Sequence, residues 1–176
     1  MPDNINQKLS MHELGRMNKD EFKLTEKNKI ILVLDNVRSL NNIGSAFRTA
    51  DSFLIEAIYL CGVSGTPPNK EIEKTALGAT NTVSWNYFKT TGEAVETLKS
   101  AGYFIASVEQ AKHSVMLNQF SKPGKPIALI FGNEVYGVEQ DIIDKSDACL
   151  EIPQFGTKHS LNVSVSIGIV LWEIMR

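Results

Sequence analysis

Features that would place this chain in a specialised class are scarce or missing among its 176 residues. Only two cysteines occur, Cys61 and Cys149, and neither has a second cysteine or a histidine at metal-binding spacing. We therefore expect buried free thiols, with no disulfide and no metal site. No apolar run approaches the roughly 20 residues of a membrane-spanning helix, and the N-terminus lacks the apolar segment of a secretory signal. These absences predict a soluble, cytoplasmic protein without a membrane partner.

Three common catalytic signatures are also absent. The sequence contains no G-x-x-x-x-G-K-[ST] phosphate loop, no G-x-G-x-x-G dinucleotide fingerprint and no G-x-S-x-G nucleophile elbow. An unrelated α/β nucleotide-binding enzyme would need a phosphate loop, so this class loses its main support. The formal net charge of −2 gives no support to binding nucleic acid by overall charge.

What the chain does contain is a regular alternation of strand-like and helix-like segments. Short β-branched apolar runs alternate with segments of helical period from Lys29 onward, which is typical of βαβ units covered on both faces. We predict one α/β domain over residues 29–176, with a mainly parallel sheet of about six strands and helices on both faces. A polar extension, residues 1–28, precedes it. The expected strands are residues 29–35, 56–62, 82–88, 103–109, 126–134 and 148–153, and the last helix runs from about Ser160 to Arg176.

Ligands bind beyond the carboxyl ends of the strands in such sheets, and three loops there are unusual. The first is residues 38–51, where Asn41 or Asn42 can cap a helix and Gly44 permits a close backbone approach. Arg48 follows Asn42 by six residues, and we expect both near the same helix face. A capped helix with a surface arginine is the plainer interpretation of this segment.

The second loop is residues 130–137, where a buried strand runs directly into Gly132-Asn133-Glu134. Glycine at this position suits close contact between the backbone and a ligand, and Glu134 can accept hydrogen bonds from hydroxyl or amine groups. An ordinary turn would use the same residue types.

The third loop lies within residues 150–170. Ser160 is the expected N-cap of the last helix, and Asn162, Ser164 and Ser166 follow in its first turns although they are poor helix formers. A ligand at the helix N-terminus or close helix packing would explain them.

Together the three loops resemble motifs one, two and three of a known family. They read N-x-G-x-x-x-R-T-A-D (residues 42–51), F-G-N-E-x-x-G (131–137) and I-P-x-x-G-x-x-x-S-L-N-V-S-V (152–165). In this order they resemble the SpoU (TrmH-like) branch of the SPOUT RNA 2′-O-ribose methyltransferases. The resemblance implies a sheet whose C-terminal part is threaded into a deep trefoil knot. It also implies S-adenosyl-L-methionine as cofactor and methyl transfer to a ribose 2′-hydroxyl of tRNA or rRNA.

The resemblance also assigns site residues by motif. Arg48 is the expected key catalytic residue, and the residues expected to shape the site around it are Asn42, Glu134, Ser160 and Asn162. The cofactor is expected along the backbone near Gly132, Ile152 and Leu161, and by a looser match its ribose bonds to the Glu109 carboxylate. Because arginine stays protonated, we expect Arg48 to bind a phosphate and stabilise the developing alkoxide, not to serve as base.

Partners follow from the same resemblance. A homodimer through the last helix is expected, and its apolar residues fit either a core or a dimer contact: Val163, Ile167, Val170, Leu171 and Ile174. Such a dimer can place Arg38, Arg48 and N-terminal lysines beside one cleft. The compact architecture favours tRNA over rRNA as substrate. The alternative is a non-catalytic knotted module for RNA binding or assembly, which predicts loss of Arg48 or Asn162; both are present.

Overall fold

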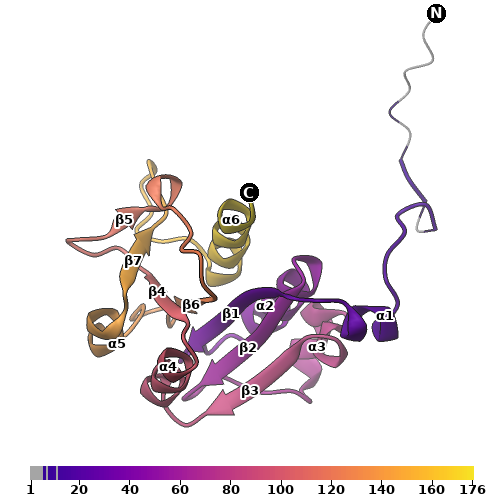
Figure 1. The fold of residues 1–176 in the computed structure, drawn as a ribbon, viewed down its shortest axis with the longest axis horizontal. Coiled ribbons are helices and arrows are strands. Elements are labelled where there is room, and N and C mark those ends of the chain that lie inside the picture. The colour runs from indigo at the N-terminus through magenta and orange to yellow at the C-terminus, as the bar shows by residue number, and fades with distance from the viewer. Residues whose placement is uncertain (1–5, 7, 11) are drawn as a thin grey trace, which may run out of the picture.

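The computed structural model describes residue 6, residues 8–10 and residues 12–176. At its centre is a seven-stranded sheet with the strand order β3-β2-β1-β6-β4-β7-β5 (Figure 1). Every pair of neighbouring strands is parallel. The strands are β1 (Asn28–Asp35), β2 (Ile55–Cys61), β3 (Ser84–Phe88), β4 (Phe104–Val108), β5 (Val115–Met116), β6 (Ile127–Phe131) and β7 (Ala148–Glu151).

The six expected strands are all present, and β5 is the additional one. It has only two residues and pairs with the end of β7. Its two apolar residues and Leu117 form a run too short to be distinguished as a strand, so the alternation used to find the other strands could not mark it.

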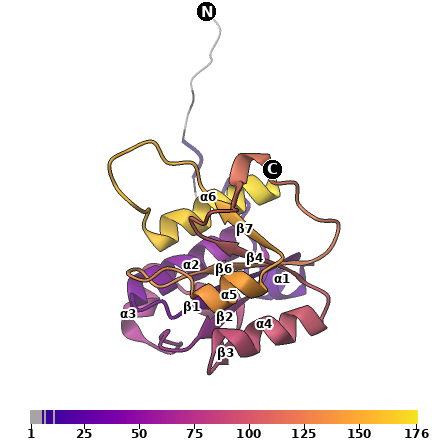
Figure 2. The ribbon, with the colours of Figure 1, turned by 90° about the vertical axis from the view of Figure 1, so that its left-hand side faces the viewer.

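Helices cover both faces of the sheet, as predicted (Figure 2). On one face a core cluster combines residues of α1 (Lys19–Leu24), α2 (Leu40–Ser52), α3 (Lys70–Ala76) and α6 (Val163–Met175). The opposite cluster contains residues of α4 (Thr91–Ser100) and α5 (Gln140–Lys145). Strand β1 shows why its apolar run is continuous: Ile30, Leu32 and Leu34 face the first cluster, while Ile31 and Val33 face the second.

The strand at the far edge departs from the prediction of coverage on both faces. In β3, three of the five residues are exposed and two are half-buried. This strand pairs only with β2, so its outer side has no neighbouring strand to support a helix across it.

The strand order fixes where a ligand can bind. Strands β2 and β3 lie on one side of β1, whereas β6 and all remaining strands lie on the other. The strands that follow β1 in the chain are therefore added first on one side of it and then on the other. The carboxyl ends of the two strands at such a switch point, β1 and β6, frame a crevice. The first two unusual loops leave β1 and β6 at this place.

Two helix starts differ from the prediction. Helix α2 is capped by Ser39, whose Oγ accepts a hydrogen bond from Asn42 N at 3.3 Å, so neither Asn41 nor Asn42 is the cap. Helix α6 begins at Val163 and not near Ser160, because Asn162 is its N-cap and accepts a bond from Ser164 N at 2.8 Å. Asn162 is thus outside the helix interior, which removes one poor helix former from it.

The N-terminal extension is described in part. Its helix α1 has a capping box between Asn18 and Glu21, and Phe22 is buried in the core cluster that also contains α2 and α6. Leu14 and Met17 are exposed. The division at residue 28 and the C-terminal knot stay predictions. In the part of the chain that the structure describes, no helix is long and apolar enough to cross a membrane.

Candidate active site

A cavity of about 680 Å³ opens at the carboxyl edge of the sheet. It lies among the loops that follow β4, β6 and β7 and the start of α6, and its volume is in the range of small-molecule sites. Seven of the residues assigned by motif line it: Glu109, Gly132, Glu134, Ile152, Ser160, Leu161 and Asn162. The structure therefore brings the second and third loops together in one site.

Glu134 is held by the start of α2. Its two carboxylate oxygens accept hydrogen bonds from the backbone N–H groups of Arg38 at 3.0 Å and Ser39 at 2.9 Å. Burial raises the pKa of Glu134, but these backbone donors and the Asn42 amide outweigh burial, and the net pKa lies below its ordinary value. The carboxylate is therefore an ionised anchor for the first loop. Glu134 also lines the cavity, and its acceptance of hydroxyl or amine groups of a ligand stays a prediction.

A chain of side-chain amides continues from Glu134 across the site. Asn42 Nδ2 donates to Glu134 Oε1 at 3.0 Å, and Asn162 Nδ2 donates to Asn42 Oδ1 at 3.1 Å. These contacts join positions 92 and 120 residues apart in sequence. All three unusual loops are thus connected by direct hydrogen bonds, and Asn162 serves both this chain and the cap of α6.

Gly132 is required by the fold of its own loop, and its expected contact with the cofactor stays a prediction. A Cβ on Gly132 would lie 2.0 Å from the Gly137 carbonyl carbon and 2.1 Å from Val138 N. Glycine is required here because the chain folds back upon itself after β6, with Asn133 and Gly137 exchanging hydrogen bonds of 3.0 and 2.9 Å. The close backbone contact is internal, and it shapes the cavity wall that Gly132 contributes.

Glu109 ties the end of β4 to the same turn. Its Oε2 accepts a hydrogen bond from Val138 N at 3.0 Å, and its Oε1 accepts one from Gln110 N at 2.8 Å. Gln110 in turn donates from Nε2 to the His159 carbonyl at 2.6 Å, which anchors the third loop. Sequence reasoning missed Gln110, although its position directly after a buried strand is the signal that marked the other loops.

Arg48 is the one assigned residue that stands apart. It is exposed on α2, on a solvent-facing stripe with Asn41 and Ser52, whereas Asn42 is buried and faces Glu134 and Asn162. The expectation of a shared helix face is wrong, because six residues at 3.6 per turn place two side chains about 120° apart. Arg48 does not line the cavity of its own chain.

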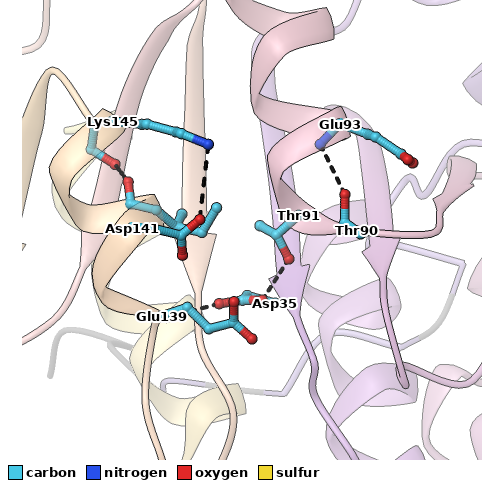
Figure 3. Close-up of polar contacts among 9 residues, drawn as sticks. Asp35, Thr90, Thr91, Glu93, Glu139, Asp141 and Lys145 are labelled. Atoms are coloured by element: carbon cyan, nitrogen blue, oxygen red, sulfur yellow. Dashed lines mark hydrogen bonds and ion pairs between the residues drawn. The ribbon is translucent and has the colours of Figure 1, made fainter.

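A hydrogen-bond network is centred on Asp35, and Figure 3 shows its contacts with Thr91 and Glu139. Asp35, at the end of β1, is fully buried and accepts hydrogen bonds from Thr91 Oγ1 at 2.5 Å, Glu139 N at 3.1 Å and Asn36 Nδ2 at 3.0 Å. The negative charge of Asp35 raises the pKa of Glu139. This network ties β1 to the starts of α4 and α5. It too was missed, and its signal is a carboxylate at the end of a buried strand.

Neither cysteine is suited to nucleophilic chemistry. Burial raises the pKa of the Cys61 thiol to about 12 and also raises that of half-buried Cys149. Both thiols are free, and Cys61 is buried as expected. Among the described residues, no three His, Cys, Asp or Glu side chains gather as a metal site would require.

The chemical character of the cavity suits a small molecule with both ring and polar groups. Its walls include apolar side chains, namely Val108, Phe131, Leu150 and Val163. Its carboxylates are those of Glu109 and Glu134, and no lysine or arginine lines it within the described part of the chain. A phosphate group inside this cavity would therefore find no cationic side chain of the same protomer.

Comparison with known proteins places this site in a family context. Residues 29–172 match the model of the SpoU rRNA Methylase family. An uncharacterized tRNA/rRNA methyltransferase of Borreliella burgdorferi is 34% identical over 157 residues, covering 89% of this chain and 68% of the relative. The 23S rRNA (guanosine-2′-O-)-methyltransferase RlmB of Vibrio parahaemolyticus is 29% identical, covering 93% of this chain.

A solved structure agrees with these relatives. The AdoMet-bound rRNA methyltransferase of Sinorhizobium meliloti superposes with a TM-score of 0.79 at 28% identity, over 85% of this chain and 56% of that protein. The chain also spans only 66% of the Vibrio enzyme.

Proposed function

Because the chain belongs to the SpoU rRNA Methylase family, we propose that it transfers a methyl group from S-adenosylmethionine to a ribose 2′-hydroxyl of tRNA or rRNA. The observation that carries this proposal is the hydrogen-bond chain of Glu134, Asn42 and Asn162, one residue from each motif, beside a cavity that Glu134 and Asn162 line. The Sinorhizobium relative is named as AdoMet-bound and the Vibrio relative as a 2′-O-methyltransferase, which agrees with both parts of the proposal.

The cavity fits the proposed cofactor in size and character. Apolar walls suit the purine of an adenosine, and the backbone of Gly132, Ile152 and Leu161 borders the space in which polar edges would be bound. The Glu109 carboxylate lines the same space and could accept from ribose hydroxyls in addition to its two backbone donors. When bound, S-adenosylmethionine supplies a methyl group on a sulfonium, which is a good leaving centre.

The remaining task of the protein is alignment and charge stabilisation. An in-line transfer needs the 2′-oxygen, the methyl carbon and the sulfur held in one line, and the hydrogen bonds of Asn42 to Glu134 and Asn162 fix the loops beside the cavity to one another. Glu134 is a poor base because backbone N–H groups and the Asn42 amide already occupy its oxygens. Ser160 lines the cavity, and its hydroxyl is suited to orienting the ribose.

We propose that the active form is a homodimer built on α6. The five apolar residues named from sequence are buried in the core of the protomer. The side chains that α6 leaves exposed are instead Val165, Ile169 and Trp172. These three recur at helical spacing and form one apolar stripe, which suits contact with the same stripe of a second copy.

The dimer also gives a role to Arg48. Helix α2 packs against α6, so a dimer built on α6 brings the second copy close to α2, on which Arg48 is exposed and outside the cavity of its own protomer. We infer that its guanidinium acts at the cavity of the partner, where it binds an RNA phosphate and stabilises the developing 2′-alkoxide. This placement supplies the positive charge that the cavity lining lacks.

The test of function is mass-spectrometric mapping of 2′-O-methylated nucleotides in tRNA and rRNA from a strain lacking the gene. We expect one site to be lost, and to be restored by the wild type but not by Arg48→Ala. Near-full activity of Arg48→Lys would contradict the need for a planar guanidinium. If every site persisted and the purified protein failed to bind S-adenosylmethionine, the chain would be a non-catalytic RNA-binding module.

The shared site is tested by mixing two inactive variants, Arg48→Ala and Asn162→Ala. A hybrid dimer contains one site with both an intact Asn162 and the partner's intact arginine. Statistical mixing should therefore restore about a quarter of wild-type activity. No recovery, with hybrid dimers demonstrated by differential tagging, would show that Arg48 acts within its own protomer.

A further inference from the structure

The turn after β6 holds two large side chains in solvent at the rim of the cavity. Val135 is 72% exposed and Tyr136 is 84% exposed, and both border the cavity. Single exposed apolar side chains are common on protein surfaces, so exposure alone decides nothing. The way in which the backbone presents these two side chains is more informative.

This turn, residues 133–137, is fixed along its length. Besides the paired backbone bonds of Asn133 and Gly137, the Asn133 side-chain oxygen accepts from Val135 N at 2.9 Å and from Tyr136 N at 3.2 Å. Asn133 Nδ2 donates to the Asn36 carbonyl at 2.7 Å, which ties the turn to the end of β1. Tyr136 is therefore presented outward by a hydrogen-bonded frame that exists before any ligand arrives.

The cavity lining carries negative charge, which limits how the protein can hold a nucleotide beside it. The carboxylates of Glu109 and Glu134 line it, and its described lining has no lysine or arginine. A target nucleotide must therefore be held beside it by contacts other than phosphate pairing within the same protomer. Aromatic side chains hold unstacked bases in this way, and tyrosine does so with little loss of side-chain entropy.

We propose that Tyr136 is a stacking surface for an unstacked nucleobase of the RNA substrate, at or next to the methylated nucleotide. This inference rests on the proposed function and names the substrate contact beside its site. A second copy of the chain fits this position less well, because a protomer seated on Tyr136 would cover the rim through which the ribose must enter. The exposed stripe of α6 offers that copy a separate apolar surface.

The experiment compares Tyr136→Ala, Tyr136→Phe and Tyr87→Ala in binding to the RNA identified by the mapping above. Tyr87 is the matched control, an exposed tyrosine on the edge strand β3. We expect Tyr136→Ala to weaken RNA binding about 5- to 150-fold, while Tyr136→Phe and Tyr87→Ala stay within about twofold of the wild type. Affinity for S-adenosylmethionine should not change, which shows that the cavity is intact.

Two further readouts identify the contact. Loss of stacking should leave the slope of log affinity against log salt unchanged, because no phosphate contact is removed. Ultraviolet crosslinking of the wild-type complex should place RNA on the peptide that contains Tyr136. Equal behaviour of Tyr136→Ala and Tyr87→Ala would overturn the inference, as would weaker RNA binding that follows dissociation of the dimer in sedimentation. If instead the wild type neither binds S-adenosylmethionine nor methylates RNA, the proposed function itself fails.

Discussion

At the residue scale, the site is organised by polar groups that satisfy one another. Glu134 anchors the first loop through Arg38 and Ser39 N–H groups, and Asn42 passes the contact on to Asn162. The motifs identified these side chains in advance but could not say which atoms they bind. From sequence, a carboxylate after a strand suggests a contact with a ligand as readily as a contact with the protein's own backbone. Only the fold shows that the first turn of α2 lies within hydrogen-bonding distance of Glu134.

The depressed pKa of Glu134 gives a prediction on stability. A carboxylate whose pKa is lower in the folded state contributes stability above its ordinary value of 4.5, and that contribution is lost as the pH falls through the folded value. We expect Glu134→Gln to lower the free energy of unfolding by about 1 kcal/mol at neutral pH, because charge-assisted bonds are lost on a partly exposed group. Urea unfolding at a series of pH values measures this.

The pH dependence distinguishes this cause from a general loss of packing. The difference between wild type and Glu134→Gln should shrink as the pH falls below 4.5. Glu96→Gln is the control, since this exposed glutamate on α4 accepts no hydrogen bond from the described residues. A difference that stays constant down to acid pH would contradict the anchoring role.

At the element scale, the sequence predicts the strands that are buried in the core. It does not predict features that depend on contacts between segments far apart in the chain. Six strands could be predicted because their apolar runs must be covered on both faces or one. Strand β5 could not be predicted, since its two residues are too few to show a strand pattern. The predicted start of α6 was about one turn too early, because Ser160 and Asn162 are both good caps. The sequence does not show that Asn42 lies close enough to hydrogen-bond with Asn162 and so to favour Asn162 as the cap.

Asn162 both caps α6 and hydrogen-bonds to Asn42, and different substitutions can separate these two roles. Asn162→Ala should lower the free energy of unfolding by about 1 to 2 kcal/mol, because both the cap of α6 and the bond to Asn42 are lost. Asn162→Ser keeps a capping oxygen and should recover most of this stability. It should not recover methyl transfer, because serine cannot span the distance to Asn42. Thermal unfolding and the methylation assay give the two readouts, and full activity of Asn162→Ser would refute the need for the cross-link.

At the scale of the whole molecule, the lysines of the N-terminal helix and the candidate active site lie at opposite edges of the sheet. Helix α1 and its lysines precede β1 and so lie at the amino edge of the sheet, whereas the three motif loops lie at the carboxyl edge (Figure 1). Within one protomer, therefore, the N-terminal lysines do not stand beside the cavity. The position of α1 follows from its place before β1, whereas the strand order could not be predicted from composition, because pairing between β1 and β6 joins segments about 100 residues apart.

The proposed dimer gives a prediction at this scale. Trp172 is 66% exposed on α6, and an interface tryptophan typically contributes 2 kcal/mol or more. We expect Trp172→Glu to weaken the dimer by at least about 30-fold and to reduce methyl transfer with it. Sedimentation measures the first effect. Leu24→Glu is the control, since Leu24 is equally apolar and more exposed but lies on α1; equal dissociation of both variants, or of neither, would contradict an interface on α6.

The hydrogen bond between Asn42 and Asn162 also bears on how the protein is made. Folding during synthesis proceeds from the N-terminus, and the site joins Asn42 of α2 to segments from the end of β4 through the first turn of α6. The early strands can pair while the wall contributed by the third loop is still missing. The site is therefore complete only after Ile167, Val170 and Leu171 of α6 have joined the core cluster. We expect a growing chain to bind no cofactor until this last helix has been made.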